Sequence, residues 1–205
     1  MSGDTIIGHG LGARAKDARA LFERYCPNGA EDETRALYEY LCLLAAMDHR
    51  DGSDGRAESP YRLVIEYGTP FTCDNSDAGL AAAGLARGQR RECAKNAWRA
   101  MSDHRLVYVE GYGRNLIPGT WHAWNHDPVG CRSFDLTWRP DPDTTPAWIG
   151  IPFTTAAVTA TSGHTGRYGL LPEVALTRDR LHDMIHPCLN DLRAANGQPP
   201  IGQTR

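Results

Sequence analysis

The sequence predicts an α+β fold in which a mainly antiparallel sheet packs against a helix that carries a candidate nucleophile. Two observations lead to this prediction: helical periodicity at both ends of the chain, and between them a helical segment followed by consecutive strand-like segments. We expect a single domain over residues 1–205, with a helical N-terminal part at 1–50, a helix-plus-sheet core of catalytic type at 61–153 and a C-terminal amphipathic helix at 177–195.

The first half of the chain predicts two helices, a strand and a loose connection. Residues 13–25 carry an apolar side, and apolar side chains recur at helical spacing after the turn at 27–29, at Leu37, Tyr40, Leu41, Leu44 and Ala45. We expect a strand at 61–67, because β-branched and aromatic residues are frequent there. Residues 73–88 are small and contain glycine, which predicts a mobile connection with at most a short helix.

The second half predicts one helix, three strands and a last helix. Four residues at helical spacing predict a helix over 92–101: Ala94, Ala97, Trp98 and Met101. Strands are expected after it at 105–112, 120–125 and 131–138. The chain then ends in an amphipathic helix, kinked at Pro187, whose apolar stripe is formed by Leu181, Met184, Ile185, Cys188, Leu189 and Leu192.

The composition is that of a globular protein with a sizeable core. Hydrophobic residues make up 41% of the 205 residues and charged residues 23%, and the formal net charge is −3. Because Asp and Glu (25) outnumber Lys and Arg (22), we expect no nucleic-acid partner. No stretch approaches the ~18 apolar residues of a membrane span, so we expect no membrane partner. The sequence predicts no particular oligomeric state.

The N-terminal residues and the cysteines indicate a reducing compartment. The first nine residues have neither a basic start nor an apolar run, so we expect no signal peptide. The six cysteines, at positions 26, 42, 73, 93, 131 and 188, form no CxxC pair and no zinc pattern. We therefore expect reduced thiols, a cytoplasmic location, no metal and no cofactor.

His122 and Asp135 are predicted to face each other across a hairpin. Asp127, Pro128 and Gly130 suit a type I turn, and pairing Asp127 with Gly130 sets a register in which His122 lies directly opposite Asp135. A carboxylate in this position orients the imidazole and stabilises the imidazolium. A bulged turn would shift the register by one residue and separate the pair.

Cys93 is the candidate nucleophile. It stands at the start of the helix expected over 92–101, where free backbone N–H groups, the helix dipole and the preceding Arg90 and Arg91 favour a thiolate. A thiolate that faces a His–Asp pair is the arrangement for acyl transfer through a thioester. The backbone N–H of Cys93 is the natural oxyanion donor, and the side chain of Gln89 is a second candidate.

Several further residues are candidates for a substrate cleft. Trp121, Trp124, Glu110 and Tyr112 lie on the strands expected beside the His–Asp pair. Each has a structural alternative: the tryptophans also suit a core, and Glu110 also suits a charge on a sheet. The segment 73–88 precedes Cys93 and has few residues that would anchor it, so we expect it to cover the cleft as a lid.

The order of motifs resembles the transglutaminase-like superfamily within the papain-like cysteine fold. The motifs are ECAKNAW at 92–98, VEGY at 109–112, WHAW at 121–124 and FDLTW at 134–138. The resemblance covers residues 61–153 and is greatest to small uncharacterised bacterial and phage members. It implies a catalytic triad of nucleophile Cys93, base His122 and orienter Asp135. Unlike the family pattern, the sequence has Leu136, not proline, after the aspartate.

The sequence thus predicts a cysteine-dependent hydrolase or acyltransferase that acts on an amide or peptide bond of a peptide, protein or small amide substrate. The alternative is a non-catalytic binding or interaction protein on the same scaffold. A third possibility is a metallohydrolase, because His182 and His186 are four residues apart on the expected C-terminal helix. No third ligand is evident there, so we expect a solvated helix face and no zinc.

Overall fold

The computed structural model describes residues 4–48, 50, 57–114, 119–141, 143–172 and 176–202, with side chains described from residue 13 onward. Its strands form a sheet in the order β1-β6-β3-β4-β5-β2. The strands are β1 (Thr69–Phe71), β2 (Cys73–Asp74), β3 (Val107–Arg114), β4 (Thr120–Asp127), β5 (Arg132–Phe134) and β6 (Ala147–Phe153). All neighbours pair antiparallel except β2 with β5, which are parallel.

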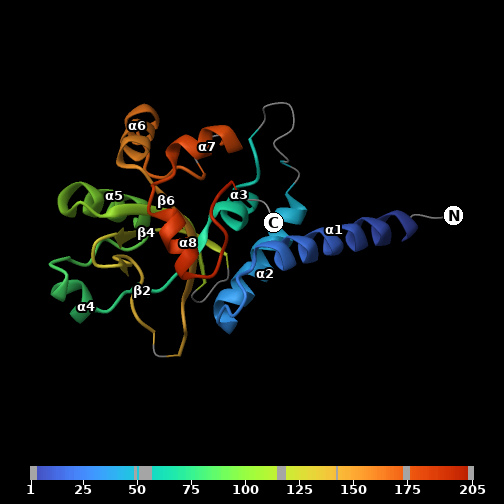
Figure 1. Cartoon of the computed structure of the whole chain (residues 1–205), viewed down its shortest axis with the longest axis horizontal. Coiled ribbons are helices and arrows are strands. Elements are labelled where there is room, and N and C mark those ends of the chain that lie inside the picture. The colour runs from blue at the N-terminus through green and yellow to red at the C-terminus, as the bar shows by residue number, and fades with distance from the viewer. Residues whose placement is uncertain are drawn as a thin grey trace.

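The helices cluster before, within and after the strand-rich part of the chain. They are α1 (Asp4–Tyr25), α2 (Asp32–Met47), α3 (Pro60–Tyr67), α4 (Asp77–Ala82), α5 (Cys93–His104), α6 (Thr155–Thr165), α7 (Arg178–Met184) and α8 (Leu189–Ala195). In Figure 1, α1 and α2 lie on one side of the molecule, and α4 and α5 lie on the other. The predicted α+β class, with its mainly antiparallel sheet, is confirmed.

Both faces of the sheet are buried. On one face, alternating residues such as Tyr108 and Ile149 join a large core with Leu37 of α2, Val64 of α3 and Ala97 of α5. On the other face a smaller core is built from Phe71, Cys73, Val109, Trp124 and Trp148, with Leu192 of α8 packed against it. Figure 1 shows α8 in front of the sheet. Among the described residues, no helix has both the length and the apolar character that crossing a membrane requires.

The segment 61–67 forms helix α3 and not the expected strand. Pro60 occupies the first turn, where its missing N–H and fixed φ suit a helix start. Leu63, Val64 and Ile65 are all buried, and α3 packs against α2. The strand prediction relied on β-branched and aromatic content, which burial against a neighbouring helix overrides.

The C-terminal segment forms two helices and not one kinked helix. α7 ends at Met184, and Ile185 is extended and forms a β-bridge with Phe153. His186 precedes Pro187, and a residue before proline is disfavoured in the helical region. The chain re-enters a helix only at Leu189. The interruption therefore joins the last strand β6 to the C-terminal helices through backbone pairing.

Candidate active site

Cys93 is the first residue of α5, so the predicted position at a helix start is confirmed. Arg91, two residues earlier, has a left-handed backbone with φ of 64°, which turns the chain into the helix. No side chain caps the first turn of α5. The first backbone N–H groups of a helix have no intrahelical partner, so they remain available beside the thiol. Cys93 itself is 8% exposed.

His122 and Asp135 form a buried pair. His122 Nε2 lies 2.8 Å from Asp135 Oδ2, and the two side chains are 2% and 0% exposed. The predicted contact is therefore present, although the predicted register is wrong. Asp127 pairs with Arg132 and not with Gly130, a shift of two residues.

The shift preserves the contact because strand side chains alternate with a period of two. Asp135 stays on the face of β4 that carries His122, and it reaches the imidazole diagonally just beyond the end of β5 at Phe134. The longer loop at 128–131 includes Cys131 with a φ of 51°. A left-handed non-glycine residue in the loop is the feature that the turn prediction did not anticipate.

The carboxylate of Asp135 is held on both sides. Its Oδ1 accepts hydrogen bonds from the backbone N–H groups of Thr137 (2.8 Å) and Trp138 (3.1 Å), while Oδ2 faces His122. The backbone N–H of Asp135 donates to the carbonyl of Asp74 on β2 at 3.1 Å. The Trp138 ring stacks on His122, with centroids 3.9 Å apart and an interplanar angle of 12°. The imidazole is thus fixed in position and orientation.

Electrostatics favour a charged imidazole in this site. Burial lowers the pKa of His122, but the charge of Asp135 and its hydrogen bond outweigh burial, and the Cys93 thiol adds to the rise. The net effect raises the pKa of His122 from 6.5 to about 9. His122 is therefore a strong base, and its protonated form is favoured near neutral pH.

Cys93 and His122 line one cavity of about 600 Å³. The other lining residues are Arg90, Arg91, Thr120, Trp121, Thr137, Trp138, Arg139, Pro140 and Asp141. One wall is aromatic, from Trp121 and Trp138, and the rim carries charged residues from both sides of the site. A cavity that combines an apolar wall with a few convergent polar groups is the usual form of a small-molecule or peptide site. Thr120, Thr137 and the residues 139–141 are the part of this lining that the sequence did not predict.

Three of the four predicted cleft residues lie elsewhere. Only Trp121 lines the cavity. Trp124 is fully buried in the core beneath β4, and Tyr112 packs in the main core, stacked on Tyr61 at 4.9 Å. Both rings are enclosed in cores that pack on the sheet, so neither reaches the cavity.

Glu110 is a buried structural carboxylate and not a cleft residue. It is 0% exposed, and its two oxygens accept hydrogen bonds from Tyr108 Oη, Trp121 Nε1 and the backbone N–H groups of Leu170 and Leu171, at 2.7 to 2.9 Å. Burial raises the pKa of Glu110, while these four donors oppose the rise. Glu110 fixes Trp121, and through it one wall of the cavity.

Gln89 does not line the Cys93 cavity. It lines a separate hollow beside Asn96 and Arg99. Its backbone N–H and carbonyl are both held by the Asn96 side chain, at 3.1 and 2.7 Å. Asn96 also donates to Thr137 Oγ1 at 2.9 Å. This amide therefore ties the segment before Cys93 to the segment after Asp135, and it is a site residue that sequence reasoning missed.

The prediction that residues 73–88 form a lid is wrong. Leu80 and Leu85 are buried in a core with Phe134 and Leu136, and none of the residues 73–88 lines the Cys93 cavity. The Gly88 N–H donates to the carbonyl of Leu136 at 2.8 Å. The segment packs beside the Asp135 region and is anchored by these two leucines. The prediction gave weight to the small residues of the segment and overlooked the leucines.

The metal alternative has no support in the geometry. His182 lies in α7, whereas His186 lies beyond its end, so the two do not share a helix. His186 Nδ1 accepts a hydrogen bond from the backbone N–H of Cys188 at 3.2 Å. Within the described parts of the chain, no group of three or more His, Cys, Asp and Glu side chains is placed to hold a metal ion.

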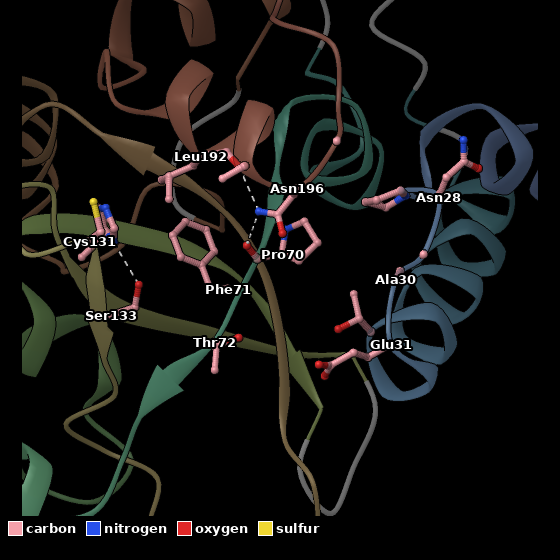
Figure 2. A pocket seen from close by; sticks show the side chains of 16 residues that line it. Asn28, Ala30, Glu31, Pro70, Phe71, Thr72, Cys131, Ser133, Leu192 and Asn196 are labelled. Atoms are coloured by element: carbon pink, nitrogen blue, oxygen red, sulfur yellow. Dashed lines mark hydrogen bonds between the residues drawn. The ribbon is translucent and has the colours of Figure 1, made fainter.

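A second hollow, of about 560 Å³, also holds a histidine and a cysteine (Figure 2). His126 Nδ1 lies 3.0 Å from Ser133 Oγ, and Cys131 stands exposed nearby. Burial lowers the pKa of His126. No carboxylate in the described residues hydrogen-bonds His126, so this hollow lacks the orienting group that the Cys93 cavity has.

The fold and the site define an α+β protein with a cysteine at a helix start, facing a buried His–Asp pair. Comparisons with family models, curated proteins and solved structures found no match to the chain.

Proposed function

We propose that the protein is a cysteine-dependent hydrolase or acyltransferase of the transglutaminase-like kind, acting on an amide or peptide bond through a thioester. The observation that carries this proposal is that Cys93 and His122 line one cavity, while the buried Asp135 lies 2.8 Å from His122 Nε2. Nucleophile, base and orienting group are the three roles that covalent acyl transfer requires.

In the proposed mechanism the proton of the Cys93 thiol passes to His122, and the resulting imidazolium is the state that the raised pKa of His122 favours. Asp135 is hydrogen-bonded to Nε2 of His122, so Nδ1 is the ring nitrogen that receives the thiol proton. The Cys93 sulfur attacks the amide carbonyl carbon, and the carbonyl oxygen becomes an oxyanion. The uncapped first turn of α5 supplies backbone N–H groups to stabilise this charge.

The imidazolium then gives its proton to the leaving nitrogen, the C–N bond breaks, and an amine departs from a thioester on Cys93. Water or a second amine attacks the thioester while His122 removes its proton, and the thiolate leaves. Water yields a carboxylic acid, whereas an amine yields a new amide. The stacked Trp138 and the wall at Trp121 limit water access on one side of the thioester.

Alkylation by iodoacetamide near neutral pH, read by peptide mass analysis at each cysteine, tests the proposal. We expect Cys93 to react faster than the exposed Cys131, and Cys42 not to react, because Cys42 is fully buried and burial raises its pKa to about 12. His122→Asn should slow the reaction at Cys93 at least about tenfold. The matched variant His126→Asn, on the same strand but outside the cavity, should leave it unchanged.

A screen of peptide and small-amide libraries with Cys93→Ala as the control then identifies the reaction. Rapid labelling of Cys93 without any turnover would favour the alternative, a binding protein on the same scaffold. A Cys93 thiol that reacts no faster than Cys42 would refute the catalytic proposal.

A further inference from the structure

Three arginines stand at the rim of the Cys93 cavity. Arg90, Arg91 and Arg139 all line it, and all three are exposed. None of them forms an ion pair or a side-chain hydrogen bond with another residue that the structure describes, although the charge of Arg139 also acts on Asp77 at longer range. Arg87 and Arg132 nearby are paired with aspartates. Unpaired guanidinium groups at a cavity remain free to bind an incoming anion.

The lining contains one opposing charge. Asp141 is half-buried, and its Oδ1 accepts a hydrogen bond from the backbone N–H of Asp143 at 3.0 Å. Three arginines against one aspartate leave the rim positive by two charges, before the imidazolium of His122 is counted. The whole chain carries a formal charge of −3, so the positive rim is a local feature set against an acidic background.

The arginines come from two hydrogen-bonded segments of the chain. Arg90 and Arg91 directly precede Cys93, and their segment is fixed through the Asn96 clamp on Gln89. Arg139 directly follows Trp138, whose carbonyl accepts a hydrogen bond from Arg87 at 2.7 Å. The cavity that holds the thiol therefore has positive charges both beside Cys93 and beside the ring that stacks on His122.

We propose that the site selects an anionic acyl donor, namely an acidic peptide segment with a carboxylate close to the attacked amide. This inference rests on the proposed function, because it assigns the substrate class of the same cysteine site. Guanidinium groups bind carboxylates through charge-assisted, often bidentate hydrogen bonds. A positive rim also raises the local concentration of anions and the rate at which they reach the thiol.

Two alkylating probes of matched size separate this inference from the proposed function. Iodoacetate is an anion and iodoacetamide is neutral, and both attack the same thiolate. The ratio of their rate constants at Cys93, divided by the same ratio for free 2-mercaptoethanol, cancels differences in thiolate fraction and intrinsic reactivity. We expect this normalised ratio to exceed one by at least about fivefold at low ionic strength, and to fall as salt screens the rim.

Each of Arg90→Gln, Arg91→Gln and Arg139→Gln should lower the normalised ratio about two- to threefold, and the triple variant should bring it close to one. Arg99→Gln is the matched control, because Arg99 is an exposed arginine of α5 that lines a different hollow. Should the triple variant not fold, the single variants carry the test, since each removes one charge from the surface.

The outcomes are distinct. Rapid reaction of Cys93 with iodoacetamide together with a normalised ratio of one or less would refute the selection of anions. An Arg99→Gln variant that lowers the ratio as much as the rim variants would refute it too. In both cases the catalytic proposal stands. If Cys93 reacts with neither reagent, the proposed function and this inference both fail. A high ratio that is lost only in the rim variants supports an acidic acyl donor.

Discussion

Replacing Asp135 with asparagine should reverse the charge state of His122. Asparagine keeps an Oδ1 that can accept the hydrogen bonds from Thr137 and Trp138, so the local backbone should stay in place. It removes the negative charge that outweighs burial. With burial left as the largest influence, the pKa of His122 should fall from about 9 to below 6.5.

The size of the effect follows from the shift. A rise from 6.5 to about 9 is a change of about 2.5 pKa units, equivalent to about 3 kcal/mol. Because the folded pKa is raised, this stabilisation is fully present below pH 6.5 and is lost as the pH rises through about 9. The difference in unfolding free energy between wild type and Asp135→Asn should therefore be largest near about pH 6 and shrink by about 3 kcal/mol toward about pH 9.5.

Two measurements check this reasoning. Urea unfolding across that pH range gives the free-energy difference, in which contributions of titrating groups remote from His122 cancel. The NMR titration of the His122 ring Cε1–H gives the pKa itself. A His122 that titrates near 6.5 in both proteins, or a free-energy difference that does not vary with pH, would show that the buried ion pair does not exist.

The same substitution should abolish catalysis by a separate route. The asparagine amide N–H₂ would donate to His122 Nε2, which forces the proton onto Nδ1 and leaves that nitrogen unable to accept the thiol proton. We expect a loss of about three to four orders of magnitude in kcat/KM. Full activity in the variant would mean that Asp135 does not orient His122.

Three further predictions concern the supports of the site. Glu110→Gln should lower the unfolding free energy by about 3 kcal/mol or more in urea unfolding, because an amide offers one acceptor oxygen to four donors. Glu23→Gln, in an exposed ion pair, should change it by less than about 0.5 kcal/mol, and equal effects would contradict the buried role of Glu110. Arg87→Met should lower the unfolding free energy by about 1–2 kcal/mol and slow the alkylation of Cys93, because it removes the donors to the carbonyls of Trp138 and Asn75. Asp77→Asn changes only the exposed ion pair of Arg87, so it should have neither effect. The amides of Leu85, Gly88 and Asp135 should exchange hydrogen slowly both in the free protein and after alkylation of Cys93, because all three are hydrogen-bonded inside the fold. Fast exchange in the free protein that becomes slow after alkylation would support the lid prediction instead.

Local signals were sufficient for three of the helices that the structure describes, including the start of α5. Periodicity and turn residues located α1, α2 and α5, because these helices are specified by neighbours within a few residues. The same reasoning assigned no element to β6, an internal strand of the sheet. β6 contains Gly150 and Pro152, which local propensity disfavours in strands. Gly150 is required by a distant residue: a Cβ there would come within 2.5 Å of the Trp124 ring.

For the candidate site, the sequence predicted the residues to which we assign the reaction and missed most of those that hold them. His122 and Asp135 were paired by the alternation of a hairpin, a rule that tolerates a register error of two residues. Glu110 and Trp124 were placed in the cleft because strand position alone does not tell which face is covered. Which face of a strand is covered depends here on α8 and on the segment around Leu170, and both come from the C-terminal part of the chain.

The support of Asp135 explains why a segment that resembles a lid has a different role. Asp135 to Trp138 have no regular secondary structure, so the orienting carboxylate lies on an irregular segment. Rigidity comes instead from cross-links to residues 74–96: the carbonyl of Asp74, the N–H of Gly88, the guanidinium of Arg87 and the amide of Asn96. Mobility in this segment would displace Asp135 and with it the imidazole. Access to Cys93 is therefore through the cavity that residues such as Arg90, Thr120 and Pro140 line, to which residues 73–88 contribute nothing.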